Sequence, residues 1–274
     1  MRTTHFIIYY SSESESAGRE AGVIAEKWHS ILSRKLGFAP GGVTPIYLYP
    51  DRRSFSEATG IPPGESIVGL AHTRTLVVRL DASGAFVKLE GVIPHELVHV
   101  LITRRLRGAA MRLPLWLHEG LAKYLAEDWT AADAELLADA AAGGGIMPLA
   151  EISNVFPEDE EKRSIAYVQS YSAVEYLARR YTSQSIRDLL SEVGAGRRFE
   201  TAFLYSVGVS PEDFEEQWRQ HLWEEYKLSR WIKLGSGLVG AAMGVLAILA
   251  FRARMIYKRR RARELQEMED TWRL

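Results

Sequence analysis

The stretch "GVIPHELVHVLITRRL", residues 91–106, places two histidines around a glutamate inside an apolar run. On a helix, His95 and His99 share one face, where both imidazoles can reach one ion. Glu96 lies beside that face, where its carboxylate can contact a water on the ion. This H-E-x-x-H pattern indicates a zinc site with two histidine ligands and a general base. We expect Pro94 in the first turn of this helix, where proline is tolerated.

A third protein ligand is expected, because a catalytic zinc commonly has three and keeps one position open for water. Residues 100–106, "VLITRRL", supply no further histidine or carboxylate. The next candidate is Glu119, within "LPLWLHEGLAKYLA", which has the apolar spacing of a second helix. If the first helix ends near residues 107–108, the second can return antiparallel and bring Glu119 to the histidines. His118 adjoins Glu119 and is an alternative ligand.

Length and composition bound the rest of the chain. Its 274 residues, 47% hydrophobic and 25% charged, are enough for one sizeable core or two subdomains around a cleft. A net charge of −1 gives the chain no overall positive potential to attract nucleic acid, so no nucleic-acid partner is expected. The chain has no cysteine, which excludes disulfides, thiolate metal ligands and a cysteine nucleophile.

Strand patterns come first along the chain and helix patterns follow. This order predicts an α+β fold with a small N-terminal mixed β-sheet, an active-site helix and a helical C-terminal lobe. The expected strands are residues 4–10, 43–50, 66–72 and 75–80, with helices at 16–37 and 54–60. The later expected helices are residues 114–129, 131–142, 164–181, 185–193, 198–207 and 210–231.

A long uncharged segment lies near the C-terminus. Residues 234–251, "LGSGLVGAAMGVLAILAF", carry no charge, and a helix of that length rises about 27 Å, close to the hydrocarbon thickness of a bilayer. Trp231 and Lys233 precede it, and the basic stretch "RARMIYKRRRAR" follows. We therefore predict a transmembrane helix over residues 231–252, after a soluble domain of residues 1–230.

The basic residues predict the orientation of this helix. By the positive-inside rule, residues 253–274 form a cytoplasmic tail, which places residues 1–230 outside the cytoplasm at the cell membrane. The apolar run "FIIYY" near the N-terminus is too short for a signal-peptide core and is typical of a strand. Two alternatives follow: the natural precursor carries a signal peptide, which we favour, or the span is a tail anchor of a cytoplasmic domain.

The two histidine–glutamate motifs carry a family resemblance. "HELVHV" and "LPLWLHEGLAKYL" resemble the peptidase MA-like group of the gluzincins, relatives of thermolysin and the zinc aminopeptidases, over roughly residues 5–225. The resemblance implies a thermolysin-like zincin fold. It also implies that His95, His99 and Glu119 bind Zn²⁺ and that Glu96 is the catalytic base.

A third segment extends the resemblance. "AYVQSYSAVEYLARRY" resembles the aminopeptidase helix whose tyrosine stabilises the oxyanion, and this match falls on Tyr167. Tyr171 and Tyr176 on the same segment are alternatives. There are also two departures. No G-x-M-E-N sequence precedes the zinc helix, so an aminopeptidase is not expected, and Lys123 stands where thermolysin-like enzymes carry an aspartate that orients a zinc histidine.

The hypothesis is a membrane-anchored, zinc-dependent metalloendopeptidase that acts on a peptide or protein substrate. Glu96 and Tyr167 are its expected catalytic residues, and the substrate is expected to pair with an edge strand within residues 66–72 or 75–80. One rival is a catalytically silent zinc-binding domain of the same fold that acts as a membrane-tethered binding module. The other is a membrane scaffold with accidental histidines. Substrate, regulators and oligomeric state stay open.

Overall fold

The chain divides into two compact units, Met1–Leu222 and Trp223–Leu274. The computed structural model of the chain describes residues 1–39, 41–64, 69–72, 77–81, 89–106, 112–226 and 252. Among these residues, no helix is long and apolar enough to cross a bilayer. The expected boundary at residue 230 and the expected span of residues 234–251 lie outside the described residues, so both stay predictions.

A mixed four-stranded sheet forms the N-terminal part of the first unit, as the sequence predicts. Its strands are β1 (Phe6–Tyr9), β2 (Thr44–Tyr49), β3 (Gly69–His72) and β4 (Val77–Asp81), in the order β1-β2-β4-β3. β1, β2 and β4 are parallel, whereas β3 runs antiparallel to β4 and lies at the edge of the sheet. Of the two segments expected to offer an edge for a substrate, the one containing β3 is at an edge of the sheet that the described residues form.

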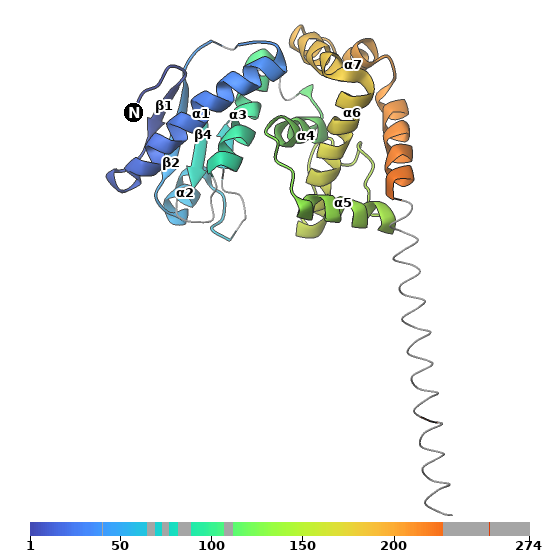
Figure 1. Ribbon diagram of the computed structural model, residues 1–274, viewed down its shortest axis with the longest axis horizontal. Coiled ribbons are helices and arrows are strands. Elements are labelled where there is room, and N and C mark those ends of the chain that lie inside the picture. Colours follow the sequence, from blue (N-terminus) through green and yellow to red (C-terminus); the bar gives the residue numbers. More distant parts are fainter. Residues whose placement is uncertain are drawn as a thin grey trace, which may run out of the picture. The chain divides into compact units, whose positions relative to one another are not determined.

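Two helices pack on this sheet and on each other, α1 (Glu15–Leu36) and α3 (Leu89–Arg105) (Figure 1). The alternation of β2 explains the packing, because Thr44, Ile46 and Leu48 are buried while the residues between them are half-exposed. A short helix, α2 (Arg52–Thr59), follows β2 and is capped by the Asp51 carboxylate, which accepts from the Ser54 N–H.

The H-E-x-x-H pattern lies in the buried helix α3. Nearly every residue from Ile93 to Thr103 is buried, so the helix is a core element and not a surface one. Its start corrects one expectation: α3 begins at Leu89, and Pro94 therefore lies inside the helix, beyond its first turn. Proline has no N–H, so the usual helical hydrogen bond to the Glu90 carbonyl cannot form.

The C-terminal part is helical and centred on one long helix. Its elements are α4 (Leu115–Leu125), α5 (Ala131–Gly143), α6 (Glu160–Gly194), α7 (Phe199–Val207) and a helix of residues 211–226. α6 packs against α4, α5 and α7 (Figure 1). It is divided at Thr182, whose backbone at φ 80° and ψ 154° is not helical, and the two stretches on either side contain the expected helices of residues 164–181 and 185–193.

The contact between α4 and α6 is close because of one glycine. A Cβ added to Gly120 would lie 2.3 Å from the Ser170 carbonyl oxygen, which belongs to the backbone of α6. Only glycine therefore allows this approach, and the approach determines where the preceding residue, Glu119, is held. α3 also packs against α4, so the two helices with the candidate ligands are direct neighbours.

Candidate metal centre

The three candidate ligands meet, although α3 and α4 are separate helices. The Nε2 atoms of His95 and His99 each lie 3.6 Å from Glu119 Oε2, and all three ligand atoms lie within 4.8 Å of one another. Two ligands bound tetrahedrally at about 2.1 Å from zinc are about 3.4 Å apart. The spacing of these atoms therefore fits a single metal ion.

Burial and mutual charge interactions shift the pKa values of all three candidate ligands. Burial lowers the pKa of His99 to about 3, so this imidazole is neutral and can offer a lone pair. Burial lowers the pKa of His95 too, but the contact with Glu119 and the charges of Glu96, Glu119 and Asp128 outweigh it and raise that pKa overall. Burial alone would raise the pKa of Glu119, but His99 and His95 lower it to about 2, so the carboxylate is ionised.

His118, the alternative ligand, has different surroundings. Its ring stacks on the His99 ring with centroids 4.5 Å apart, and its buried Nε2 has no hydrogen-bond partner among the described residues. His118 lines a cavity together with Trp116 and Glu215. Among the described residues, the lining of this cavity does not include His95, His99 or Glu119. The cluster of possible ligand atoms comprises His95, His99 and Glu119 and excludes His118.

Glu96 lies between the metal cluster and the edge strand. Its side chain is 7% exposed, and burial raises its pKa to about 7. The His95 charge and the Ala71 backbone N–H, which donates to this carboxylate, lower the pKa, whereas Glu119 raises it. A Cβ added to Gly69 would lie 2.8 Å from Glu96 Oε1, so β3 passes directly over the carboxylate. A carboxyl group that titrates near neutral pH is well suited to general base catalysis.

Tyr167 and Tyr171 lie one turn apart on α6 but in different environments. Burial raises the pKa of Tyr167, and the charges of Glu119 and Glu96 raise it further. Tyr171 instead stacks on Trp129 with centroids 4.2 Å apart, and burial and Glu175 raise its pKa to about 12.

The third tyrosine, Tyr176, packs far along the same helix. Its ring stacks on His221 with centroids 5.0 Å apart and also contacts Phe214, within the helical part of the unit. Of Tyr167 and Tyr171, Tyr167 is the one whose pKa the charges of Glu119 and Glu96 raise.

A family model for the peptidase MA superfamily matches residues 28–224, well over half of the chain. The chain belongs to the peptidase MA superfamily. No curated protein matches the chain. The matched region contains α3, α4 and α6, and therefore all the candidate ligands together with Glu96 and Tyr167. Members of this superfamily are usually metal-dependent peptidases, although such domains can be inactive.

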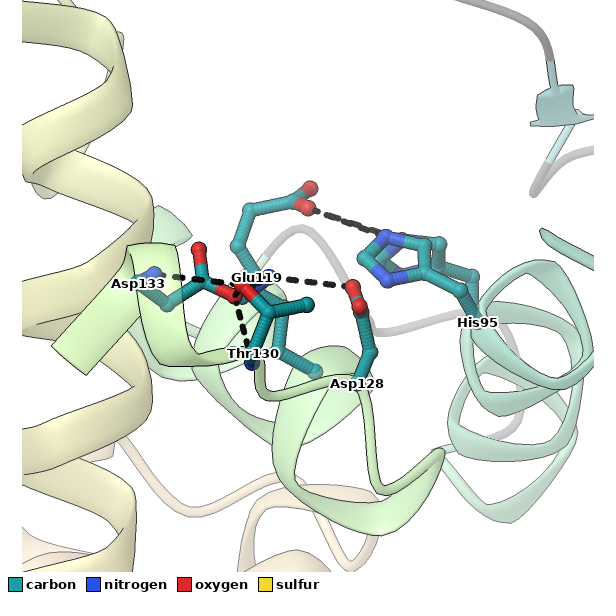
Figure 2. A network of polar contacts seen from close by, with 7 residues as sticks. His95, Glu119, Asp128, Thr130 and Asp133 are labelled. Atoms are coloured by element: carbon teal, nitrogen blue, oxygen red, sulfur yellow. Dashed lines mark hydrogen bonds and ion pairs between the residues drawn. The ribbon is translucent and has the colours of Figure 1, made fainter. Parts of the chain in front are cut away.

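The structure gives this peptidase MA domain polar partners that the sequence reading missed. Lys123, which departs from the thermolysin-like pattern, is buried and pairs with Asp128 at 3.0 Å and with Asp133 at 3.9 Å. Figure 2 shows Asp128 and Asp133 with the polar contacts that they make. The sequence "TAAD" at residues 130–133 could have predicted the end of this loop, because it matches a capping box at the start of α5. No comparable sequence pattern predicts that Lys123 lies close to Asp128.

Gln169 and Ser170, which replace the lysine and glycine of the aminopeptidase helix, have structural roles. The Gln169 side-chain amide accepts from the Met147 N–H and donates to the Met147 carbonyl, both at 3.0 Å. This pair of bonds ties α6 to the segment after α5. The Ser170 hydroxyl donates to the Ala166 carbonyl within α6, so neither residue points to the metal cluster as a ligand.

Proposed function

We propose that this protein is a zinc-dependent metalloendopeptidase of the gluzincin type that hydrolyses a peptide or protein substrate. One observation carries the proposal: a buried glutamate with a pKa near neutrality lies beside a cluster of two histidines and a carboxylate. A metal site that only stabilises the fold needs no such base. The superfamily membership supports the reaction class.

The donor set supports zinc as the metal. His95, His99 and Glu119 offer two imidazole nitrogens and one carboxylate oxygen, a set found in catalytic zinc sites that keep a fourth position open. A bound zinc supplies a water of lowered pKa and a Lewis acid for the substrate carbonyl.

Glu96 and Tyr167 then have separate roles in the reaction. Glu96 accepts the proton of the attacking water and passes it to the leaving amine, for which a pKa near 7 is suitable in both directions. The Tyr167 hydroxyl donates a hydrogen bond to the oxygen on which negative charge develops. A tyrosine hydroxyl is protonated at neutral pH, as a donor must be, and the raised pKa of Tyr167 extends this to higher pH.

The substrate binds along β3 in this proposal. β3 is an edge strand and passes over Glu96, so an extended peptide that adds to its open edge brings a backbone carbonyl toward the metal cluster. Binding through main-chain hydrogen bonds favours cleavage within a chain. The missing G-x-M-E-N sequence likewise argues against recognition of a free amino terminus.

We also propose that residues 234–251 anchor the enzyme in the membrane, with the peptidase domain outside and residues 253–274 in the cytoplasm. The support is the absence of charge in that segment and the seven basic residues that follow within twelve positions. Protease added to intact spheroplasts that express the natural precursor is expected to digest the peptidase domain and spare the tail. A peptidase domain protected until lysis would reverse the orientation and favour a tail-anchored cytoplasmic enzyme.

Glu96→Gln tests the proposed reaction most directly. The amide has almost the same size but cannot accept the proton, so we expect at least about 10²-fold lower turnover of a peptide library with zinc content unchanged. Equal turnover by the variant would exclude Glu96 as the base. Wild-type protein that binds zinc but cleaves no peptide in such a library would favour the silent binding module.

A further inference from the structure

The cavity that His118 lines lies beside the start of α4. Its volume is about 540 Å³, and its apolar wall comprises Leu113, Trp116, Leu149 and Phe199. Pockets of roughly 300–1,000 Å³ that combine apolar walls with a few polar groups are typical of small-molecule sites. The described part of the lining includes none of the three candidate metal ligands, so this cavity is separate from the metal cluster.

Three helices begin at this cavity. Leu115 of α4, Phe199 of α7 and Pro211 of the helix of residues 211–226 are the first residues of their helices, and all three line the cavity. The N-terminus of a helix presents N–H groups that have no acceptor within the helix, and it carries a partial positive charge. Three helix ends therefore favour negative charge in the cavity.

The start of α4 is the least compensated of these three helix ends. The first turn of α7 carries Glu200, and in the helix of residues 211–226 the Ser210 hydroxyl accepts from the Asp213 N–H. α4 has no acidic residue in its first turn, and its N-cap is a proline, which offers no side-chain acceptor. Within the described residues, the Trp116 N–H in this first turn has no acceptor.

Two side chains close to this helix end also lack partners. Arg112 lies two residues before the N-cap, and its exposed guanidinium makes no ion pair or hydrogen bond in the described part of the chain. One turn into α4, neither ring nitrogen of His118 has a hydrogen-bond partner among the described residues, and its Nε2 is buried. A buried polar group without a partner is costly, so a ligand that forms a hydrogen bond with this ring is favoured.

The cavity also contains carboxylates, which come from α7 and from the helix of residues 211–226: Glu200, Glu212 and Glu215. Two of them are balanced by arginines, since Glu215 pairs with Arg219 at 2.9 Å and Glu200 pairs with Arg198 at 3.5 Å. Glu212 is exposed and has no such pair in the part of the chain that the structure describes. One guanidinium and one carboxylate of the lining are thus left unpaired, and the free donors at residues 112–118 favour an anion on that side.

We propose that this cavity binds a carboxylate attached to an apolar group, as at the end of a peptide with an apolar last residue or in an aromatic acid. The carboxylate lies at the start of α4 and accepts from the Trp116 N–H, the Arg112 guanidinium and the His118 ring. The apolar group packs against Leu113 and Phe199. This site goes beyond the proposed peptidase reaction and does not depend on a bound metal.

The test is isothermal titration calorimetry on the full chain, stripped of metal so that carboxylates cannot bind to zinc instead. The probes are 4-phenylbutanoate and N-acetylphenylalanine, and the uncharged amide of each is its control. Charge-assisted hydrogen bonds are the stronger kind, so we expect a carboxylate to bind about 10-fold more tightly than its amide. Binding of both carboxylates means that free aromatic acids are accepted, and binding of N-acetylphenylalanine alone means that a peptide end is required.

Charge variants locate the bound carboxylate. Arg112→Gln should weaken binding of the carboxylates about 10-fold and leave binding of the amides unchanged. Arg34→Gln is the matched control, because Arg34 is an exposed arginine on α1 that does not line the cavity. Glu212→Gln should instead strengthen binding of the carboxylates about 2-fold, since it removes a like charge from the lining.

His118→Phe tests the hydrogen bond to the ring. Phenylalanine can keep the stacking on His99 but has no polar ring atom, so we expect the carboxylates to bind about 5-fold more weakly. Circular dichroism checks that each variant is folded. If His118→Phe does not fold, Arg112→Gln still tests the proposal, because the Arg112 side chain is exposed.

Four results would overturn the proposal: no binding of either carboxylate at millimolar concentration, equal binding of acids and amides, equal losses in Arg112→Gln and Arg34→Gln, or tighter binding of 4-phenylbutylamine than of 4-phenylbutanoate. The last result would mean that the carboxylates of the lining dominate and that the cavity takes a cation. Because the measurements use metal-free protein, failure of the proposed zinc site would leave them unaffected.

Discussion

Helices α3 and α4 both carry candidate ligands, but their ligands are positioned in different ways. α3 holds two histidines and the proposed base within five residues, and helical periodicity alone puts the histidines on one face. α4 contributes one carboxylate, whose place depends on the close contact of Gly120 with α6. The difference shows that local sequence determines one half of the site, while tertiary packing determines the other half.

The largest expected effect tests whether both helices are needed for the metal. We expect His99→Ala on α3 and Glu119→Ala on α4 each to abolish zinc retention in the purified protein, measured by metal analysis. Each removes one of the three candidate ligands found among the described residues, and a zinc site with an open position needs all three. Full zinc retention in Glu119→Ala would remove α4 from the ligand set and return His118 to consideration.

The next effect concerns α6, the helix that supports α4. Tyr167→Phe should lower kcat about 10²-fold, the scale for one oxyanion donor, with zinc content unchanged. Tyr171→Phe is the matched control one turn away, and its kcat should stay near wild type because Tyr171 packs against Trp129. The reverse result would mean that Tyr171 and not Tyr167 faces the substrate.

Much of the architecture follows from sequence pattern. Alternation in β2 and apolar spacing in α1 predict the elements of a mixed sheet with covering helices, and both are observed. The break in α6 at Thr182 falls between the two helices that the sequence predicts, residues 164–181 and 185–193. The start of α3 before Pro94 was missed, because burial of this helix stabilises it despite the hydrogen bond that proline cannot make.

The candidate site was predictable to a similar extent. Spacing along the chain indicates His95 and His99 together, and the glutamate on the following helix is a reasonable third member. The partners from other elements were not predictable: the Ala71 N–H that reaches Glu96 lies on a strand far back in the sequence. The Lys123–Asp128 pair was also missed, because it depends on a turn that a glutamate closes in place of glycine.

A smaller effect on the free energy of unfolding is expected from two helical glycines, one in α4 and one in α3. Gly120→Ala should lower the free energy of unfolding by about 1–3 kcal/mol, because the new methyl group meets backbone atoms of α6 that cannot move aside. Gly91→Ala in α3 meets nothing within 4 Å and should raise it by about 0.5 kcal/mol through the helix preference of alanine. Urea denaturation of the metal-free proteins measures both. Equal effects would mean that α4 is packed no more tightly than α3.

The smallest effect is at the end of α4, where Glu127 has a left-handed backbone at φ 57°. Such a conformation costs a side-chain-bearing residue about 1–2 kcal/mol, and glycine adopts it freely. Glu127→Gly also removes the ion pair with Lys35 at 2.7 Å, but the Glu127 side chain is 68% exposed, so that loss is at most about 1 kcal/mol. We expect a net rise of about 0.5 kcal/mol in the free energy of unfolding.

Glu127→Gln isolates the backbone contribution, because it removes the charge but keeps a side chain on a residue with a left-handed backbone conformation. The glycine variant should therefore be more stable than the glutamine variant by about 1 kcal/mol in urea denaturation, once the greater freedom of glycine in the unfolded chain is included. Zinc affinity should be unchanged in both variants. The N–H groups of residues 127 and 128 donate to the carbonyls of Tyr124 and Lys123, and these hydrogen bonds use only backbone atoms. A glycine variant less stable than the glutamine variant would show that side-chain contacts of Glu127, and not the turn geometry, hold the end of α4.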